Sequence, residues 1–224
     1  MYKAVKLLKG KSCHVSFINF ARKEIAFKIV YYGPALCGKT TNLEQIHSSI
    51  VPESRGEMTV LSTQADRTLF FDFLPLKSEI IKGFTSKFQL YTVPGQTIYR
   101  ETRKLVLRNV DGLVFVADSQ WEKMEENAES FQDLIDNLAE QNVSIDKIPY
   151  MLQFNKRDLS NVAPAHYMDF MLNQRETRVP TMDAVARDGL GVFETLNIMA
   201  KMILASFMKE NNMAMAEVPD DVCV

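Results

Sequence analysis

The feature that most constrains the fold is the decapeptide GPALCGKTTN at residues 33–42, which follows the apolar run FKIVYY. Gly33, Gly38, Lys39 and Thr40 fit the phosphate-loop pattern G-x-x-x-x-G-K-[ST], between an expected strand and an expected helix. Backbone N–H groups at the start of such a helix converge on phosphates. A glycine-containing turn ahead of a helix is the alternative, but these flanks favour nucleotide binding.

The residue types of this loop predict specific contacts. Lys39 would reach the β and γ phosphates, and the Thr40 hydroxyl would ligate Mg²⁺. The other loop residues expected to line the nucleotide are Ala35, Leu36, Cys37 and Thr41.

Composition limits the partners. The chain has 26 basic and 28 acidic residues among 224, so no global charge favours nucleic acid or an anionic membrane. Its three cysteines form no CxxC pair, which favours a reducing compartment and argues against structural zinc. The sequence contains no apolar run near 18 residues and no signal peptide. We therefore expect a cytoplasmic protein with no nucleic-acid partner and no stable membrane insertion.

Strand and helix patterns alternate along the chain, which predicts a three-layer α/β fold with a mostly parallel sheet. The runs at 69–76 and 86–93 are too close for a crossover helix and should form one antiparallel edge pair. Further strands are expected at 28–32, 112–119 and 149–155, and helices at 39–50, 121–141 and 192–207. We expect an N-terminal extension at 1–15, one domain at 16–208 and a flexible tail at 209–224.

A second motif identifies the base. Asn155, Lys156 and Asp158 in FNKRD follow an expected strand. A carboxylate there accepts two hydrogen bonds from guanine N1–H and N2–H, whereas adenine has no matching donor pair. Alone, the motif could be an ordinary strand-end loop; after a phosphate loop, it indicates GTP rather than ATP.

Several segments together carry a family resemblance. The phosphate loop, TVPGQ, NKRD and VARDGLGVF resemble the Ras-like small GTPases. SFINF, KIVYYGP, CGKTTNL, DRTLFFDFLPL and GLVFVADSQ are similar to the bacterial MglA family, over residues 16–205. The resemblance implies a Ras-like G domain and a cytoplasmic GTP/GDP switch in cell polarity or gliding motility, concentrated at a cell pole. It also implies a roadblock-domain (MglB-like) partner that stimulates hydrolysis, and effectors that bind the GTP state.

The resemblance also implies residue roles. In the segment before the strand at 69–76, Thr68 would meet Mg²⁺ and the γ-phosphate, and Arg67 would supply a catalytic guanidinium in cis. Gln96 would orient the attacking water, and Gly95 would let the backbone follow the γ-phosphate. A surface arginine and a simple Pro-Gly turn are the alternatives. Two further residues fall where small G proteins contact the guanine oxygen, Ala186 and Arg187.

The chain departs from Ras-like enzymes at two positions. Thr92 replaces the acid of D-x-x-G that holds Mg²⁺ through water, and a hydroxyl cannot replace that charge. Asp72 or Asp66 could restore it, and we favour Asp72 because its strand adjoins the phosphate site. Ala35 replaces the usual glycine of GPGLCGKT. Its methyl group either crowds the glutamine and slows hydrolysis, or is tolerated because the backbone there suits an L-residue.

Three functions remain open at this point. A cycling switch hydrolyses GTP slowly until a partner assists it, whereas a scaffold locked by Ala35 and Thr92 would bind partners without turnover. An ATP-using phosphotransferase is disfavoured by Asp158.

The N-terminus has two interpretations. Either Val15 is the true initiator, encoded by an alternative start codon, or the lysines of residues 1–14 form a basic amphipathic arm for a membrane or partner.

Overall fold

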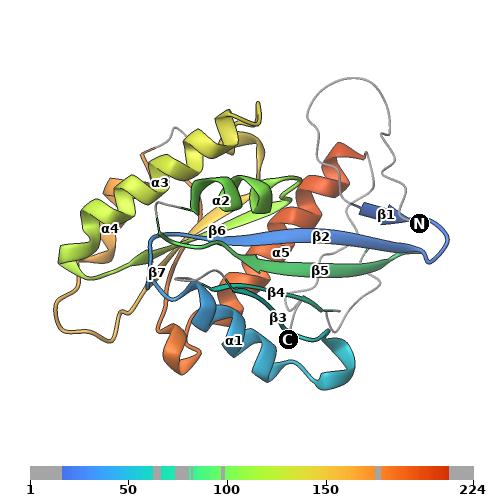
Figure 1. Ribbon diagram of the computed structural model, residues 1–224, viewed down its shortest axis with the longest axis horizontal. Helices are drawn as coiled ribbons and strands as arrows, with labels where there is room; N and C mark the ends of the chain where they lie inside the picture. The colour runs from blue at the N-terminus through green and yellow to red at the C-terminus, as the bar shows by residue number, and fades with distance from the viewer. Residues whose placement is uncertain are drawn as a thin grey trace.

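The computed structural model describes residues 17–62, 67–73, 81, 83–96, 99–174 and 178–211, with the backbone alone for residues 17, 60–62 and 67–73. Its centre is a sheet in the order β3-β4-β5-β2-β6-β7-β8, with β1 paired to β2 (Figure 1). The strands are β1 Phe17–Asn19, β2 Glu24–Tyr32, β3 Thr59–Ser62, β4 Arg67–Phe73, β5 Thr85–Thr92, β6 Gly112–Asp118, β7 Tyr150–Asn155 and β8 Thr181–Asp183.

The strand pairing confirms the predicted parallel core. Strand β2 pairs in parallel with β5 and β6, and β7 pairs in parallel with β6 and β8. The antiparallel part is larger than the single pair predicted, because β1 joins β2 and β3 joins β4 in addition to the expected β4–β5 pair. The two antiparallel strands that were not predicted, β1 and β3, have three and four residues, and neither carries a long apolar run. Strand β8, three residues long and parallel to β7, was not predicted either.

Five α-helices cover the sheet in the described part of the chain. They are α1 Lys39–Ser49, α2 Arg100–Leu107, α3 Met124–Ala139, α4 Ala165–Leu172 and α5 Val192–Glu210. Residues of α1 and α5 pack in one core with alternate residues of β2, whereas α2, α3 and α4 pack in a second core on the other face. Figure 1 shows α1 on the side of the sheet opposite α2 and α3. The predicted three layers are therefore confirmed.

The parallel strands end at one edge of the sheet. Tyr31 of β2 lies opposite Thr92 of β5 and Val114 of β6, and Asp118 of β6 lies opposite Asn155 of β7. Strand β2 lies at the centre of the sheet, with β5 on one side and β6 on the other, so the chain order reverses at this point. Open α/β sheets bind ligands at such a switch point. The loops after β2, β5, β6 and β7 therefore converge on one site.

The chain ends bear on the predicted domain limits. Helix α5 runs to Glu210, two residues beyond the predicted boundary at 208. Residues 1–16 and 212–224 lie outside the described residues, as do the predictions made for them. Among the described helices, none combines the length and the apolar character needed to cross a membrane.

Candidate functional site

Two glycines allow the phosphate loop to lie against its neighbours. Gly33 has φ +143°, and a Cβ there would lie 2.1 Å from the carbonyl oxygen of Val116. Gly38 has φ +103°, and a Cβ there would lie 2.1 Å from Nδ2 of Asn155. A side chain at either position would therefore disturb the loop, because φ is positive at both and the space is taken by a backbone carbonyl at Gly33 and by the Asn155 amide at Gly38.

Lys39 places its ammonium group inside this loop. It is the first residue of α1 and is only 6% exposed. Its Nζ donates hydrogen bonds to the carbonyl oxygens of Gly33, at 2.9 Å, and Pro34, at 2.5 Å. A cation at a helix N-terminus, wrapped by a loop that glycine keeps open, fits the phosphates of a nucleotide.

Cys37 is a buried, uncharged residue in the same loop. Its side chain is fully buried, and its Sγ lies 3.7 Å from Nζ of Lys39. Burial raises the pKa of the Cys37 thiol, so it stays protonated at neutral pH.

Asn155 connects the phosphate loop to the base-binding segments. It ends β7 and is 3% exposed. Its Nδ2 donates to the carbonyl oxygen of Cys37 at 2.8 Å, and its Oδ1 accepts from the backbone N–H of Ala186 at 2.9 Å. One buried side chain therefore joins three segments that are distant in sequence.

The base-binding motif surrounds a pocket of about 210 Å³. It is lined by Leu36, Gly38, Thr41, Asn155, Lys156, Asp158, Leu159, Val185, Ala186 and Arg187. The predicted base residues and part of the phosphate loop are thus brought together. Nη2 of Arg187 lies 3.3 Å from Oδ2 of Asp158, with its own side chain 74% exposed. Hydrogen bonding to Asp188 and the charge of Asp158 raise the pKa of Arg187.

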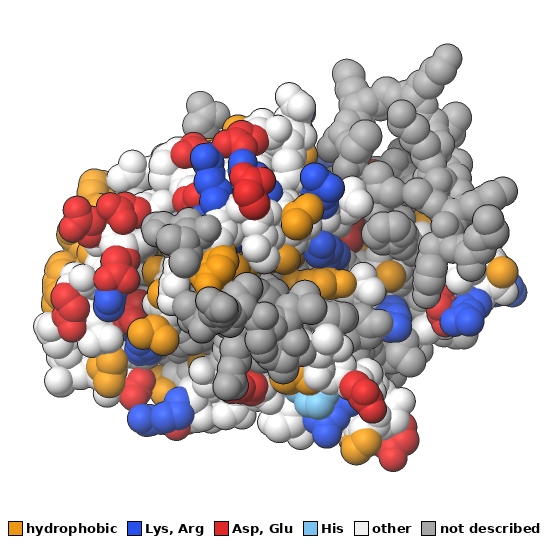
Figure 2. Space-filling model, viewed as in Figure 1, with side chains coloured by type: hydrophobic (Ala, Val, Ile, Leu, Met, Phe, Trp, Pro, Cys, Tyr) orange, Lys and Arg blue, Asp and Glu red, His pale blue; other side chains and the backbone are white. Residues whose placement is uncertain are grey.

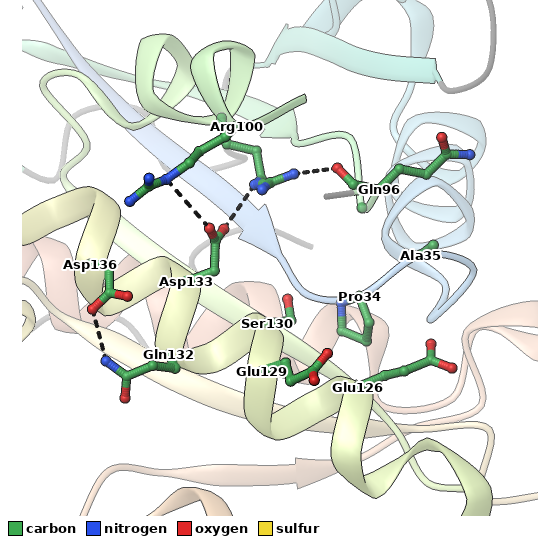
Figure 3. A pocket seen from close by; sticks show the side chains of 12 residues that line it. Pro34, Ala35, Gln96, Arg100, Glu126, Glu129, Ser130, Gln132, Asp133 and Asp136 are labelled. Atoms are coloured by element: carbon green, nitrogen blue, oxygen red, sulfur yellow. Dashed lines mark hydrogen bonds and ion pairs between the residues drawn. The ribbon is translucent and has the colours of Figure 1, made fainter. Parts of the chain in front are cut away.

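A third segment lies against the other side of the phosphate loop. A Cβ at Gly95 would lie 2.5 Å from both the nitrogen and the Cα of Ala35, so only glycine allows this approach. Ala35, Gly95 and Gln96 line one wall of a groove of about 900 Å³, with α2 and α3 opposite. Figure 3 shows the Gln96 side chain pointing away from α3 and its backbone carbonyl turned toward α3.

Arg67 and Thr68 lie at the end of the sheet where the parallel strands finish. They are the first two residues of β4, not part of a segment before the strand as predicted, because β3 pairs with them. Phe70 lies opposite Tyr91 in the antiparallel β4–β5 pair, so the start of β4 adjoins the end of β5. The backbone thus brings both residues toward the phosphate loop.

Asp72 is placed less favourably. Its Cα lies opposite Gln89, whereas β5 ends at Thr92, three residues further along. Three strand residues span about 10 Å. This register weighs against the predicted metal role of Asp72.

The magnesium site is only partly defined by the described side chains. Thr40 follows Lys39 in α1 and is half-buried, as a hydroxyl ligand at the phosphates requires. Thr92 is fully buried. Among described residues, no three His, Cys, Asp or Glu side chains are grouped to hold a metal ion. The Thr40 hydroxyl fits Mg²⁺, whereas Asp66, the other acid predicted to replace Thr92, lies outside the described residues.

Sequence reasoning missed several polar residues around the loops. Asp118 ends the buried strand β6 and pairs with Nζ of Lys156 at 2.5 Å. An acid that closes an apolar run at the carboxyl end of a strand could have indicated it. Arg103 and Asp133 form an ion pair behind Gln96 in which the arginine is buried and the acid is partly exposed. Neither residue belongs to a sequence pattern that could have indicated it, and the helix that carries Arg103 was not predicted.

Comparison with known proteins agrees with this geometry. The profile of the ADP-ribosylation factor family matches residues 15–203. The chain is also 54% identical over 195 residues to the mutual gliding-motility protein MglA of Myxococcus xanthus (strain DK1622), covering 87% of this chain and 99% of that protein.

The chain belongs to the MglA family of small GTPases. The predicted family is thereby confirmed, and with it GTP binding and GTPase activity. More distant relatives are the Ras and EF-hand domain-containing protein of Xenopus tropicalis, 29% identical over 141 residues, and its Mus musculus homologue, 30% identical over 137. The matches cover 63% and 61% of this MglA-family chain but 17% and 19% of those longer proteins.

Proposed function

We propose that this chain is a GTP/GDP switch in bacterial cell polarity or motility, acting in the cytoplasm and concentrated at a cell pole. The observation that carries the proposal is the Asn155 side chain, which joins the phosphate loop to the backbone of Ala186. Phosphate and guanine contacts thus form one constellation. The gliding-motility relative supports the process, because it is similar over nearly its whole length.

Guanine selection falls to Asp158, which lines the base pocket. Its carboxylate would accept hydrogen bonds from guanine N1–H and N2–H. Lys156, two residues earlier in the motif, is held by its ion pair with Asp118. The loop of Ala186 and Arg187 would place a backbone N–H against the guanine oxygen, while the Ala186 N–H itself donates to Oδ1 of Asn155. Adenine would leave the Asp158 charge without its two donors.

Phosphate binding falls to Lys39 and the N–H groups at the start of α1. When bound at Thr40, with Thr68 as a second hydroxyl ligand, Mg²⁺ would supply the positive charge that neutralises the β and γ phosphates.

The cleavage step uses Gln96 and Arg67. Gln96 holds and orients a water for attack on the γ-phosphorus, and Gly95 lets its backbone reach that position. In this proposal the Arg67 guanidinium would stabilise the charge that develops on the transferred phosphoryl group, an effect worth about 10³ to 10⁵ in rate in related reactions. We expect this arrangement to be incomplete without a roadblock-domain partner, so intrinsic hydrolysis is slow and effectors bind the GTP state.

A second candidate is a nucleotide-locked scaffold with negligible turnover. The contact between Ala35 and Gly95 favours it, because the backbone of the loop that carries Gln96 lies directly on the loop that carries the Ala35 methyl group. In this second proposal the Ala35 methyl would restrict how Gln96 rearranges.

Single-turnover hydrolysis of bound GTP distinguishes the two candidates. We expect slow cleavage that a roadblock-domain partner accelerates and that Arg67→Ala or Gln96→Ala reduces by about 10³-fold and about 10²-fold respectively. ATP serves as the control and should bind weakly. GTP that binds but is not cleaved, with or without the partner, would identify the scaffold.

A further inference from the structure

A buried arginine behind Gln96 has no part in the function described so far. Arg103 lies in α2 and is 4% exposed. Its Nη1 donates hydrogen bonds to the backbone carbonyl oxygens of Pro94, at 3.4 Å, and of Gln96. Its Nε donates to Oδ2 of Asp133 in α3, at 2.9 Å. One guanidinium therefore connects the Gln96 loop to α3.

Asp133 is the centre of a polar cluster that also includes the end of β2. The same Oδ2 accepts from the Tyr32 hydroxyl at 2.5 Å and from Nδ2 of Asn137 at 2.9 Å. Tyr32 is the last residue before the phosphate loop. Burial and the hydrogen bond to Asp133 raise the pKa of Tyr32, so its hydroxyl remains a donor. The cluster therefore contacts both the Gln96 loop, through Arg103, and the start of the phosphate loop, through Tyr32.

The backbone at Gln96 is fixed from several directions. Its carbonyl oxygen also accepts from the Tyr99 N–H at 3.2 Å, and Gly95 lies against Ala35. Figure 3 shows the Gln96 carbonyl turned toward α3 and the side chain pointing to the opposite side, so a displacement of the loop backbone away from Arg103 would move the Gln96 side chain as well. A planar guanidinium fixes such a carbonyl more rigidly than an ammonium group would.

We infer that Arg103 is a positioning residue for GTP hydrolysis, which holds the Gln96 loop through its carbonyls and is itself oriented by Asp133. The inference rests on the proposed role of Gln96. Arg103 does not touch the nucleotide; it determines where the Gln96 amide can lie. Loss of this hold would slow cleavage while GTP binding, which depends on Lys39 and the base pocket, stays intact.

Arg100 provides a matched control. It lies on the same helix and lines the same groove, and its hydrogen bonds go to Asn137 and Glu140 rather than to the Gln96 loop. Its Nε also lies 3.9 Å from Oδ1 of Asp133 (Figure 3), the carboxylate oxygen that does not bond to Arg103. Its side chain is 46% exposed, so its removal costs little. Arg100→Ala should therefore leave cleavage within about 2-fold of wild type.

The test measures single-turnover cleavage of bound GTP and the dissociation constant of a fluorescent GDP analogue, with thermal unfolding of each variant. Arg103→Lys keeps the charge but cannot span both carbonyls and Asp133. We expect it to slow cleavage by about 10- to 100-fold, and to leave the dissociation constant within about 2-fold. Asp133→Asn keeps the shape and an acceptor, and should slow cleavage by about 3- to 10-fold.

The double variant Gln96→Ala/Arg103→Lys separates positioning from an independent effect. It should be no slower than Gln96→Ala alone, because Arg103 acts only through Gln96. Multiplied losses, or Arg103→Lys and Asp133→Asn at the wild-type rate, would overturn the inference while the proposed function stands. A wild-type rate in Gln96→Ala, or no cleavage by the wild-type chain, would overturn the hydrolytic mechanism and this role of Arg103 together.

Discussion

The base end and the cleavage end of the site are held in place differently. At the base end, the motif residues hold one another: Asn155 bonds to Cys37 and Ala186, and Gly38 leaves room for it. At the cleavage end, Gln96 is held by Arg103, a residue outside any motif. Base recognition is therefore built into the motifs themselves, whereas the cleavage geometry depends on helices that surround them.

This difference implies that affinity and turnover can be separated by substitution. Changes at the base end should alter nucleotide binding and leave the cleavage of bound GTP unchanged. Changes at the α2–α3 side should do the reverse. Acidic and basic side chains lie side by side over α2 and α3 (Figure 2), where Arg100 and Lys104 both form ion pairs with Glu140.

The largest effect on the base end is expected from Asn155→Ala. It leaves the Cys37 carbonyl and the Ala186 N–H without their buried partner, and each loss costs about 1–3 kcal/mol. GTP affinity, measured by displacement of a fluorescent analogue, should fall by about 10²-fold or more. At saturating GTP, cleavage should keep its wild-type rate. A large fall in that rate would show that the two ends are coupled.

Asp158→Ala should produce a smaller and more specific effect. Inosine triphosphate lacks the exocyclic amine of guanine, so the wild-type chain should bind it about 10-fold more weakly than GTP. The variant should bind both nucleotides weakly and about equally in competition assays. Continued preference for GTP would show that another residue reads the amine.

Ala35→Gly addresses the cleavage end directly. Removal of the methyl beside Gly95 should raise the single-turnover rate by about 2- to 10-fold and leave GTP affinity unchanged. The thermal midpoint should fall slightly because glycine adds freedom to the unfolded chain. An unchanged rate would mean that the alanine is simply tolerated.

A substitution of Lys28 tests the stability of the fold, independently of the base end and the cleavage end of the site. Burial lowers the pKa of Lys28 from 10.5 to about 8. Between these values the unfolded chain binds a proton that the folded chain has released, so Lys28 makes stability rise with pH over that window. Denaturant titrations from pH 8 to 10 should show a smaller rise in Lys28→Met than in wild type. Equal rises would show that Lys28 keeps its ordinary pKa.

Much of the fold could be predicted because its patterns are local. The apolar run of β6 predicts a strand buried on both faces, and every residue from Gly112 to Asp118 is buried. The amphipathic spacing that predicted a helix at 192–207 corresponds to α5. Short strands such as β1 and β3 carry no comparable pattern. They form because they pair with the longer strands β2 and β4, and this pairing cannot be read from their own few residues.

In the candidate site, too, the residues in local motifs could be predicted and those brought together only by packing could not. The phosphate loop and FNKRD motif were predicted because each function needs residues adjacent in sequence, and the fold brings these motifs together. Arg103 and Asp133 meet only through the packing of α2 on α3, thirty residues apart, so neither could be assigned beforehand. The roles of Gln96, Arg67 and Thr68 remain predictions, as does the metal role of Asp72, which its strand register disfavours.

The most direct test of the central claim is to load the purified chain with GTP, remove free nucleotide, and follow the bound nucleotide by chromatography. We expect conversion of GTP to GDP that stays bound, in a single exponential phase, and little retention when ATP replaces GTP. Bound GTP that persists unchanged, or ATP retained as well as GTP, would contradict it.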